Sequence, residues 1–157
     1  ALLYGAGDGK IGSVVGGSKA EGKRIKQSFF ANLPTLKSLR NRITRTAEQK
    51  GFITGLDGRK IFIRSSHSAL NSLLQGAGAI VMKRALIILN ESINTNSIDA
   101  HCVANVHDEW QIETWGADVN RLGNLAINAI KSAGEYYNLN CPLDAQYKFG
   151  ENWSETH

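Results

Sequence analysis

Apolar residues recur at helical spacing in the first third of the chain. Ser18, with Glu21 three residues later, forms a capping-box pattern that predicts a helix from residue 18 to about residue 31. Pro34 then interrupts the pattern, because a proline disfavours helical conformation in the residue before it. Helical spacing resumes toward Gly51 at Leu36, Leu39 and Ile43. We therefore predict helices broken by proline and glycine over residues 10–50.

The pattern changes to short alternating runs after Gly51. Two β-rich runs flank a Gly/Asp turn within residues 51–63, and this arrangement predicts a hairpin. An apolar stripe from residue 66 to about residue 93 predicts the longest helix of the chain. Its apolar positions are Leu70, Leu73, Leu74, Ala77, Ile80, Val81 and Ile88.

A second hairpin and a second amphipathic helix follow. The hydrophobic pattern predicts two strands, over residues 102–106 and 110–113, joined by a tight turn. It predicts the helix over residues 118–137. Residues 142–149 predict a last strand before a short polar tail. Segregated helices followed by hairpin, helix and strand are typical of the α+β class. We therefore expect a helical segment and an antiparallel sheet packed against long helices.

Composition is that of a globular domain with a sizeable core. The chain has 157 residues, is 42% hydrophobic and carries a net charge of +4, which excludes intrinsic disorder. Its longest uninterrupted apolar run, residues 85–89, is far shorter than the roughly 20 residues of a membrane span, so we expect no membrane partner. The chain begins with Ala1 and its one Met is Met82, so we expect a processed chain or a piece of a longer protein.

Charge is unevenly distributed along the chain. Residues 1–98 hold 15 basic and 5 acidic side chains, whereas residues 99–157 hold 3 basic and 9 acidic ones. Such an arrangement indicates a polyanion bound on the basic side and a metal site or solvated surface on the acidic side. Lys and Arg that simply solvate helix faces remain the alternative, because a basic patch is only a first indication of nucleic-acid binding.

Several familiar motifs are incomplete. Residues 7–12 match G-x-G-x-x-G but have neither a strand before them nor a βαβ unit around them. Residues 17–24 approach a phosphate-binding loop, yet Arg24 stands where a hydroxyl must bind magnesium. Cys102 and Cys141 lack zinc-ligand spacing, and we expect Cys102 to be an inert buried thiol. Pairing of Cys102 with a catalytic histidine stays open.

The unusual feature is His107-Asp108-Glu109 at the tip of the second hairpin. Two adjacent carboxylates repel each other unless a cation lies beside them. Mg²⁺ suits this arrangement, since it takes one or two carboxylates and completes its shell with waters and substrate phosphates. The alternative is an ordinary exposed turn, in which Asp is common.

Val106-His107-Asp108-Glu109 between two strands resembles motif C of the family A DNA polymerases, and four ordered motifs extend this resemblance over essentially the whole chain. Tyr4-Gly5 resembles the end of the fingers helix that closes on the incoming nucleotide. Residues 55–59 and 67–76 resemble the palm segment that reads the primer-template minor groove, and residues 151–157 resemble the family's C-terminus. The particular residues at these motif positions favour a phage origin. A phage origin implies that the protein acts in the cytoplasm of the host cell.

The resemblance implies a role for each candidate site residue. Asp108 would bind Mg²⁺ as one of the two aspartates of a two-metal site, and Glu109 would be a secondary catalytic carboxylate. Asn71 and Gln75 are four residues apart and share one helix face, from which their amides can reach minor-groove acceptors. Tyr4 would lie in the nucleotide pocket. The remaining DNA contacts would come from Arg59, His67, His107 and His157.

The resemblance also implies what else the activity needs. Residues 1–50 would be the C-terminal part of the fingers and residues 51–157 the C-terminal part of the palm, with primer-template DNA and a dNTP as partners. The motif A aspartate and the triphosphate-binding fingers residues belong upstream of Tyr4, so we expect a chain that needs an N-terminal polymerase portion and is inactive alone. Two alternatives stay open: a non-catalytic DNA-binding module on the polymerase scaffold, and a nuclease using Asp108 and Glu109.

Overall fold

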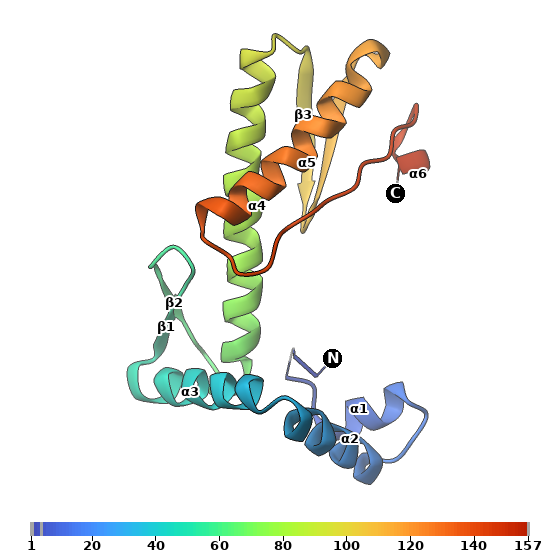
Figure 1. The fold of residues 1–157 in the computed structure, drawn as a ribbon. Helices are drawn as coiled ribbons and strands as arrows, with labels where there is room; N and C mark the ends of the chain where they lie inside the picture. Colours follow the sequence, from blue (N-terminus) through green and yellow to red (C-terminus); the bar gives the residue numbers. More distant parts are fainter. Residues whose placement is uncertain (1, 4, 157) are drawn as a thin grey trace. The chain divides into compact units, whose positions relative to one another are not determined.

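The computed structural model describes residues 2–3 and 5–156, which form two compact units, residues 1–77 and 78–157. Both units combine helices with a small antiparallel hairpin, which confirms the predicted α+β class (Figure 1). The longest helix, α4 (Ala69–Thr95), contributes its first turns to the first unit and the rest to the second. The division into fingers and palm at residue 50 stays a prediction.

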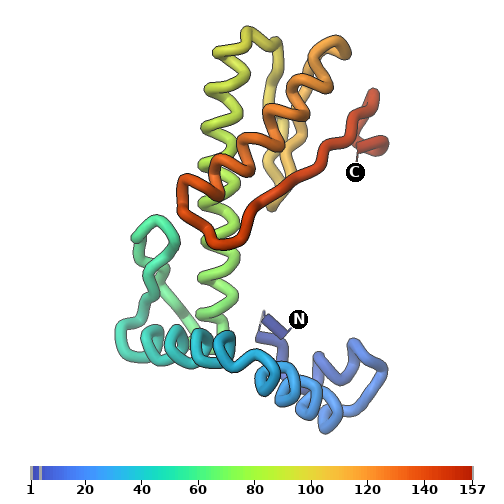
Figure 2. The backbone as a smooth tube through the Cα atoms, in the orientation of Figure 1, coloured from blue at the N-terminus to red at the C-terminus, as the bar shows by residue number. Residues whose placement is uncertain are grey.

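The first unit begins with three helices and a hairpin. These elements are α1 (Asp8–Val14), α2 (Lys19–Asn32), α3 (Pro34–Lys50), β1 (Phe52–Thr54) and β2 (Lys60–Phe62). The predicted cap is present, because the Oγ of Ser18 accepts a hydrogen bond from the backbone N–H of Glu21 at 3.2 Å. Gly51 ends α3 at a positive φ of 72°, a conformation that glycine adopts without steric cost. The chain then turns directly into the hairpin (Figure 2).

The core of the first unit lies between α3, the hairpin and the start of α4. Ile43 and Ala47 of α3 meet Ile53 of β1 and the first residues of α4 in one buried cluster. The helical spacing of Leu39, Ile43 and Ala47 explains why one side of α3 faces the hairpin. This core fixes the hairpin and the start of α4 relative to each other.

Helices α1 and α2 approach closely because glycine lies at their crossing. A Cβ atom built on Gly22 would overlap the carbonyl oxygen of Asp8 and the backbone nitrogen of Gly12. We expect Gly22→Ala to lower the free energy of unfolding by about 2 kcal/mol, as overpacking does. Gly9→Ala in α1 is the matched control, since nothing lies within 4 Å of its Cβ position. Equal thermal midpoints for the two variants would contradict this packing.

The second unit packs α5 against the later part of α4 and a second hairpin. Its elements are β3 (Ala100–Val106), β4 (Glu109–Thr114), α5 (Val119–Tyr136) and α6 (Trp153–Thr156). Leu89 and Ile93 of α4 are buried against Leu122 and Ala129 of α5, while Trp110 and Ile112 of β4 pack on the same cluster. The inner residues of β4 therefore anchor the hairpin and hold its turn in place.

The predicted last strand over residues 142–149 is wrong. The structure gives these residues no strand, and the segment runs extended beside α5 (Figure 1). The ring of Tyr147 lies where a Cβ on Gly123 would be, and its hydroxyl donates to the Oδ1 of Asn120 at 3.1 Å. Side-chain contacts with a helix thus replace the backbone pairing that a strand requires.

Helix α4 bears on the expectation that the chain has no membrane-spanning segment. By length and composition alone, the helical segment of residues 66–95 is apolar enough to cross a membrane, and 17% of its most apolar stretch is buried within the structure. The segment contains no long uninterrupted apolar run, because Lys83 and Arg84 divide it. A core helix of a globular protein has the same composition, and Ala85 and Leu89 are fully buried in protein.

Candidate functional site

The β3–β4 hairpin presents its turn at residues 107–108. Val106 pairs with Glu109 across the antiparallel ladder, so the connection has two residues, His107 and Asp108. His107 adopts a positive φ of 55°, which is uncommon for a residue with a Cβ. Strained backbone of this kind persists only where the surrounding structure imposes it, and it is frequent at functional sites.

Asp108 is the exposed carboxylate at this tip. It makes no hydrogen bond or ion pair with another residue in the described part of the chain. An unengaged carboxylate is the kind of hard oxygen donor that Mg²⁺ prefers. Within residues 2–3 and 5–156, no three His, Cys, Asp or Glu side chains lie close enough to hold a metal ion. Asp108 therefore fits a Mg²⁺ site to which other groups contribute, rather than a complete protein cage.

Glu109 lies beside Asp108 in a different environment. It is partly buried, and the side-chain amide of Gln111 donates a hydrogen bond to its Oε1. The Oε1 of Gln111 in turn accepts from the hydroxyl of Thr156 at 3.3 Å, which ties the end of the chain to the hairpin. Sequence analysis missed Gln111, although its position two residues after Glu109 on one strand face was a usable signal.

Cys102 of β3 is exposed, so its prediction as a buried thiol is wrong. The prediction depended on the apolar run around Cys102, but β3 belongs to a two-stranded sheet that leaves most of its residues exposed. Partial burial nevertheless raises the pKa of the Cys102 thiol, although a hydrogen bond to the carbonyl of Ala104 acts in the opposite direction. The thiolate is therefore disfavoured, and a nucleophilic role for Cys102 has little support.

In the first unit, the β1–β2 turn positions Arg59. The carboxylate of Asp57 accepts hydrogen bonds from the backbone N–H of Arg59, at 3.2 Å, and from its guanidinium. Desolvation raises the pKa of Asp57, but the hydrogen bonds and positive charge of Arg59 together lower it below its usual value. The Nε side of the guanidinium is thus held by Asp57, and the exposed remainder can contact a phosphate.

The predicted minor-groove residues lie at the start of α4. His67, in the short 3-10 helix Ser66–Ser68, precedes Asn71 and Gln75 at intervals of four residues, so the three share one side of the helix. His67 and Gln75 are exposed. The Oδ1 of Asn71 is buried without a hydrogen-bond partner in the described structure. Because a buried polar atom without a partner is costly, we expect this oxygen to accept a hydrogen bond from a water molecule or a bound group.

Gly5, part of the predicted Tyr4-Gly5 motif, lies near the start of α4. It has a positive φ of 76°, and a Cβ there would lie 3.1 Å from the carbonyl oxygen of His67. The end of the fingers motif and the start of α4 are therefore neighbours within the first unit. The predicted nucleotide-pocket residue Tyr4 and the predicted DNA contact His157 lie outside the described residues.

The structure thus gathers the candidates into two local sets. Arg59, His67, Asn71 and Gln75 belong to the first unit, whereas His107, Asp108 and Glu109 belong to the second. The first-unit residues offer two amides, a guanidinium and an imidazole for DNA, and the residues of the hairpin turn offer carboxylates for a metal ion. These are the chemical groups that a nucleotidyl transferase needs.

The sequence matches the DNA polymerase family A over residues 1–155, and the chain belongs to this family. Its relatives include phage polymerases at 36–42% identity and bacterial DNA polymerase I enzymes at 24–26% identity. The DNA-directed DNA polymerase of Escherichia phage Phieco32 is 42% identical over 164 residues, which cover 100% of this chain and 26% of that polymerase. The enzyme of the same name in Escherichia phage T7 is 36% identical, with 99% of this chain and 25% of that enzyme covered. This chain therefore spans about a quarter of the length of these relatives.

A solved structure supports the fold. The POL domain of Pol1 from M. smegmatis, in complex with DNA primer-template and dNTP, matches with a TM-score of 0.76 at 20% sequence identity. The match covers 84% of this chain and 25% of that chain. The arrangement of helices and small antiparallel hairpins is thus that of a polymerase domain.

Proposed function

We propose that this chain is the C-terminal portion of a template-directed DNA polymerase, which transfers a nucleotide from a dNTP to a primer 3′-hydroxyl by a two-metal mechanism. The observation that carries the proposal is the exposed, unengaged carboxylate of Asp108 at a strained hairpin tip, in a chain that belongs to family A. The relatives' names and the DNA-bound POL domain support primer-template DNA and a dNTP as its partners.

The hairpin residues have distinct tasks in this proposal. Asp108 provides a metal-binding carboxylate, and its place at the tip leaves both oxygens free to bind. Glu109, whose Oε1 accepts a hydrogen bond from Gln111, contributes negative charge beside Asp108. His107 lies next to the carboxylate and hydrogen-bonds near the primer terminus. The left-handed backbone at His107 keeps these side chains at the tip.

The first-unit residues recognise the nucleic acid. Asn71 and Gln75 donate hydrogen bonds to the purine N3 and pyrimidine O2 atoms that each correct base pair presents in the minor groove. Such contacts test base-pair shape without reading sequence. Arg59 and His67 contact the DNA backbone, while Tyr4 and His157 complete the nucleotide pocket and the DNA contacts.

The donor set fits Mg²⁺. Asp108 supplies a hard oxygen ligand, and the second aspartate of such a site belongs to the upstream part of the polymerase. When bound, Mg²⁺ supplies charge stabilisation for the attacking oxygen and the leaving pyrophosphate. The chain's own contribution is to hold one carboxylate in place and to position the primer end.

Reconstitution tests the proposal. We expect this chain, mixed with the upstream portion of the phage Phieco32 relative, to extend a primer on a template when dNTPs and Mg²⁺ are present. A gel assay of primer extension measures the result, and omission of each component is the control. Stable binding of the two parts to primer-template DNA that is insensitive to Mg²⁺, without extension, would instead favour a non-catalytic DNA-binding module. Degradation of the DNA would favour a nuclease.

A further inference from the structure

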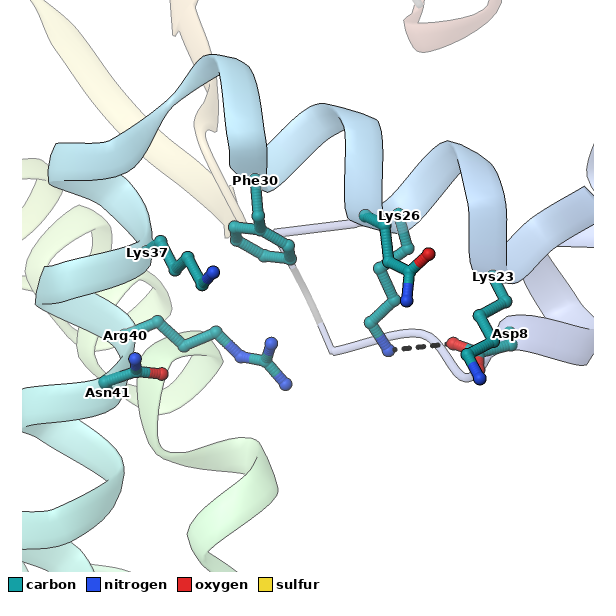
Figure 3. A pocket seen from close by; sticks show the side chains of 8 residues that line it. Asp8, Lys23, Lys26, Phe30, Lys37, Arg40 and Asn41 are labelled. Atoms are coloured by element: carbon teal, nitrogen blue, oxygen red, sulfur yellow. Dashed lines mark hydrogen bonds and ion pairs between the residues drawn. The ribbon is translucent and has the colours of Figure 1, made fainter.

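A concave pocket lies between α2 and α3 in the first unit, about 400 Å³ in volume. We call it the α2–α3 pocket. Four cationic side chains line it, two from α2 and two from α3, and Figure 3 shows Lys37 and Arg40 extending toward the side where Phe30 lies, whereas Lys26 extends toward Asp8. The four cationic residues are Lys23, Lys26, Lys37 and Arg40. None of these four residues is among the candidates at the start of α4 or on the β3–β4 hairpin.

The pocket has excess positive charge. Asp8 is the one carboxylate in its lining, and it pairs with Lys26 at 3.3 Å (Figure 3). The other three cations, Lys23, Lys37 and Arg40, form no ion pair with any residue that the structure describes. Like charges held around one cavity repel each other, and an anion placed among them removes that cost. The pocket is therefore suited to an anionic ligand.

Arg40 is already held in place. Its guanidinium carbon lies 5.1 Å from the centre of the Phe30 ring, a cation–π contact, and this ring is 7% exposed. The guanidinium N–H groups form no ion pair in the described structure, so they can bind a phosphate bidentately. Because less side-chain freedom is lost on binding, such a restrained donor increases affinity.

The shape and lining indicate the kind of anion. Gln27 and Asn41 add amides that can donate to and accept from a base, and Phe30 adds an apolar floor. A duplex keeps its bases stacked inside and offers phosphates on a convex surface, so it cannot fill a pocket. A single strand can turn a nucleotide outward, with its base against aromatic or guanidinium planes and its phosphate on cations.

We propose that the α2–α3 pocket binds an unpaired nucleotide of single-stranded DNA, with a phosphate on Lys37 and Arg40 and the base inside the pocket. The choice of DNA rests on the proposed polymerase function, because a polymerase binds an unpaired template strand. The binding itself needs neither Asp108 nor a metal ion, so each proposal can fail without the other.

The test measures binding of the 157-residue chain to a fluorescent oligothymidylate of about 12 nucleotides by anisotropy, without metal. We expect Lys37→Gln/Arg40→Gln to weaken binding about tenfold or more and to lower the slope of log K against log salt by about 1.4. Arg45→Gln/Lys50→Gln is the matched control: it removes the same charge from exposed positions of α3 outside the pocket. We expect the control to weaken binding no more than about twofold. Circular dichroism verifies that both variants fold.

Two further binding experiments test whether the ligand is a nucleotide rather than any polyanion. An abasic oligonucleotide with the same number of phosphates should bind the wild-type chain more weakly than oligothymidylate, and the Lys37→Gln/Arg40→Gln variant should lose this preference. Polyglutamate at equal charge should compete less well than oligothymidylate. Equal weakening by both double variants, no effect of removing the bases, or equal competition by polyglutamate would each overturn the proposal.

Discussion

Asp108→Ala in the reconstituted polymerase is expected to slow primer extension by about a thousandfold or more, because a metal ion contributes several kcal/mol of transition-state stabilisation and each 1.4 kcal/mol changes the rate about tenfold. The exposed carboxylate is the hairpin's free metal ligand in our proposal, and its neighbour Glu109 is restrained by Gln111. Single-turnover extension at saturating dNTP and Mg²⁺ measures the rate of the chemical step.

The control for this variant lies on the same hairpin. Glu113 is exposed and pairs with His101 across the ladder, away from the turn. Glu113→Gln removes one negative charge and should leave the extension rate within about twofold of the wild type, as is usual for exposed positions. A full rate for Asp108→Ala, or equal losses for the two variants, would contradict the assignment of the metal ligand.

The chain alone is expected to add no detectable nucleotide to a primer. Phosphoryl transfer by two metals needs ligands on both sides of one in-line displacement. Asp108 and Glu109 are adjacent in sequence, and the described residues hold no third His, Cys, Asp or Glu close enough to complete a metal site. Primer extension with each dNTP and either Mg²⁺ or Mn²⁺, at enzyme concentrations above that of the primer, provides the measurement.

Template-dependent extension by this chain alone would show that it holds a complete site and would refute the proposed division of metal ligands. Absence of that extension from a parallel preparation of Asp108→Ala would exclude a contaminating polymerase. The same preparation should still bind DNA, since Arg59, Asn71 and Gln75 do not depend on the metal.

Local sequence signals predicted most of the elements. Ser18 with Glu21, Pro34 and Gly51 marked the boundaries of two helices, because caps and breakers act through a few neighbouring atoms. The prediction of a strand over residues 142–149 failed, since a strand requires a partner edge, and Tyr147 packs on α5 instead. Cys102 was misassigned for a similar reason, because an apolar run can indicate a strand but not what covers it, and most residues of β3 are exposed.

The candidate site was predictable to a lesser degree. Asp108 and Glu109 were found through a short motif, but the different environments of the two carboxylates depend on Gln111 and Thr156, the latter far along the chain. The α2–α3 pocket was visible only as a basic stretch. Folding at the Leu33–Pro34 break brings Lys23 and Arg40 to one cavity, and no spacing rule connects residues on two helices.

The most direct test is a crystal structure of the reconstituted polymerase with primer-template DNA, a dNTP and Ca²⁺ in place of the reactive metal. Our account predicts an Asp108 carboxylate oxygen about 2.3–2.6 Å from a cation that also contacts the nucleotide phosphates. The primer end should lie beside His107, with the minor groove against Asn71 and Gln75. An ordered cation at the primer end with the Asp108 side chain directed away from it would contradict the account.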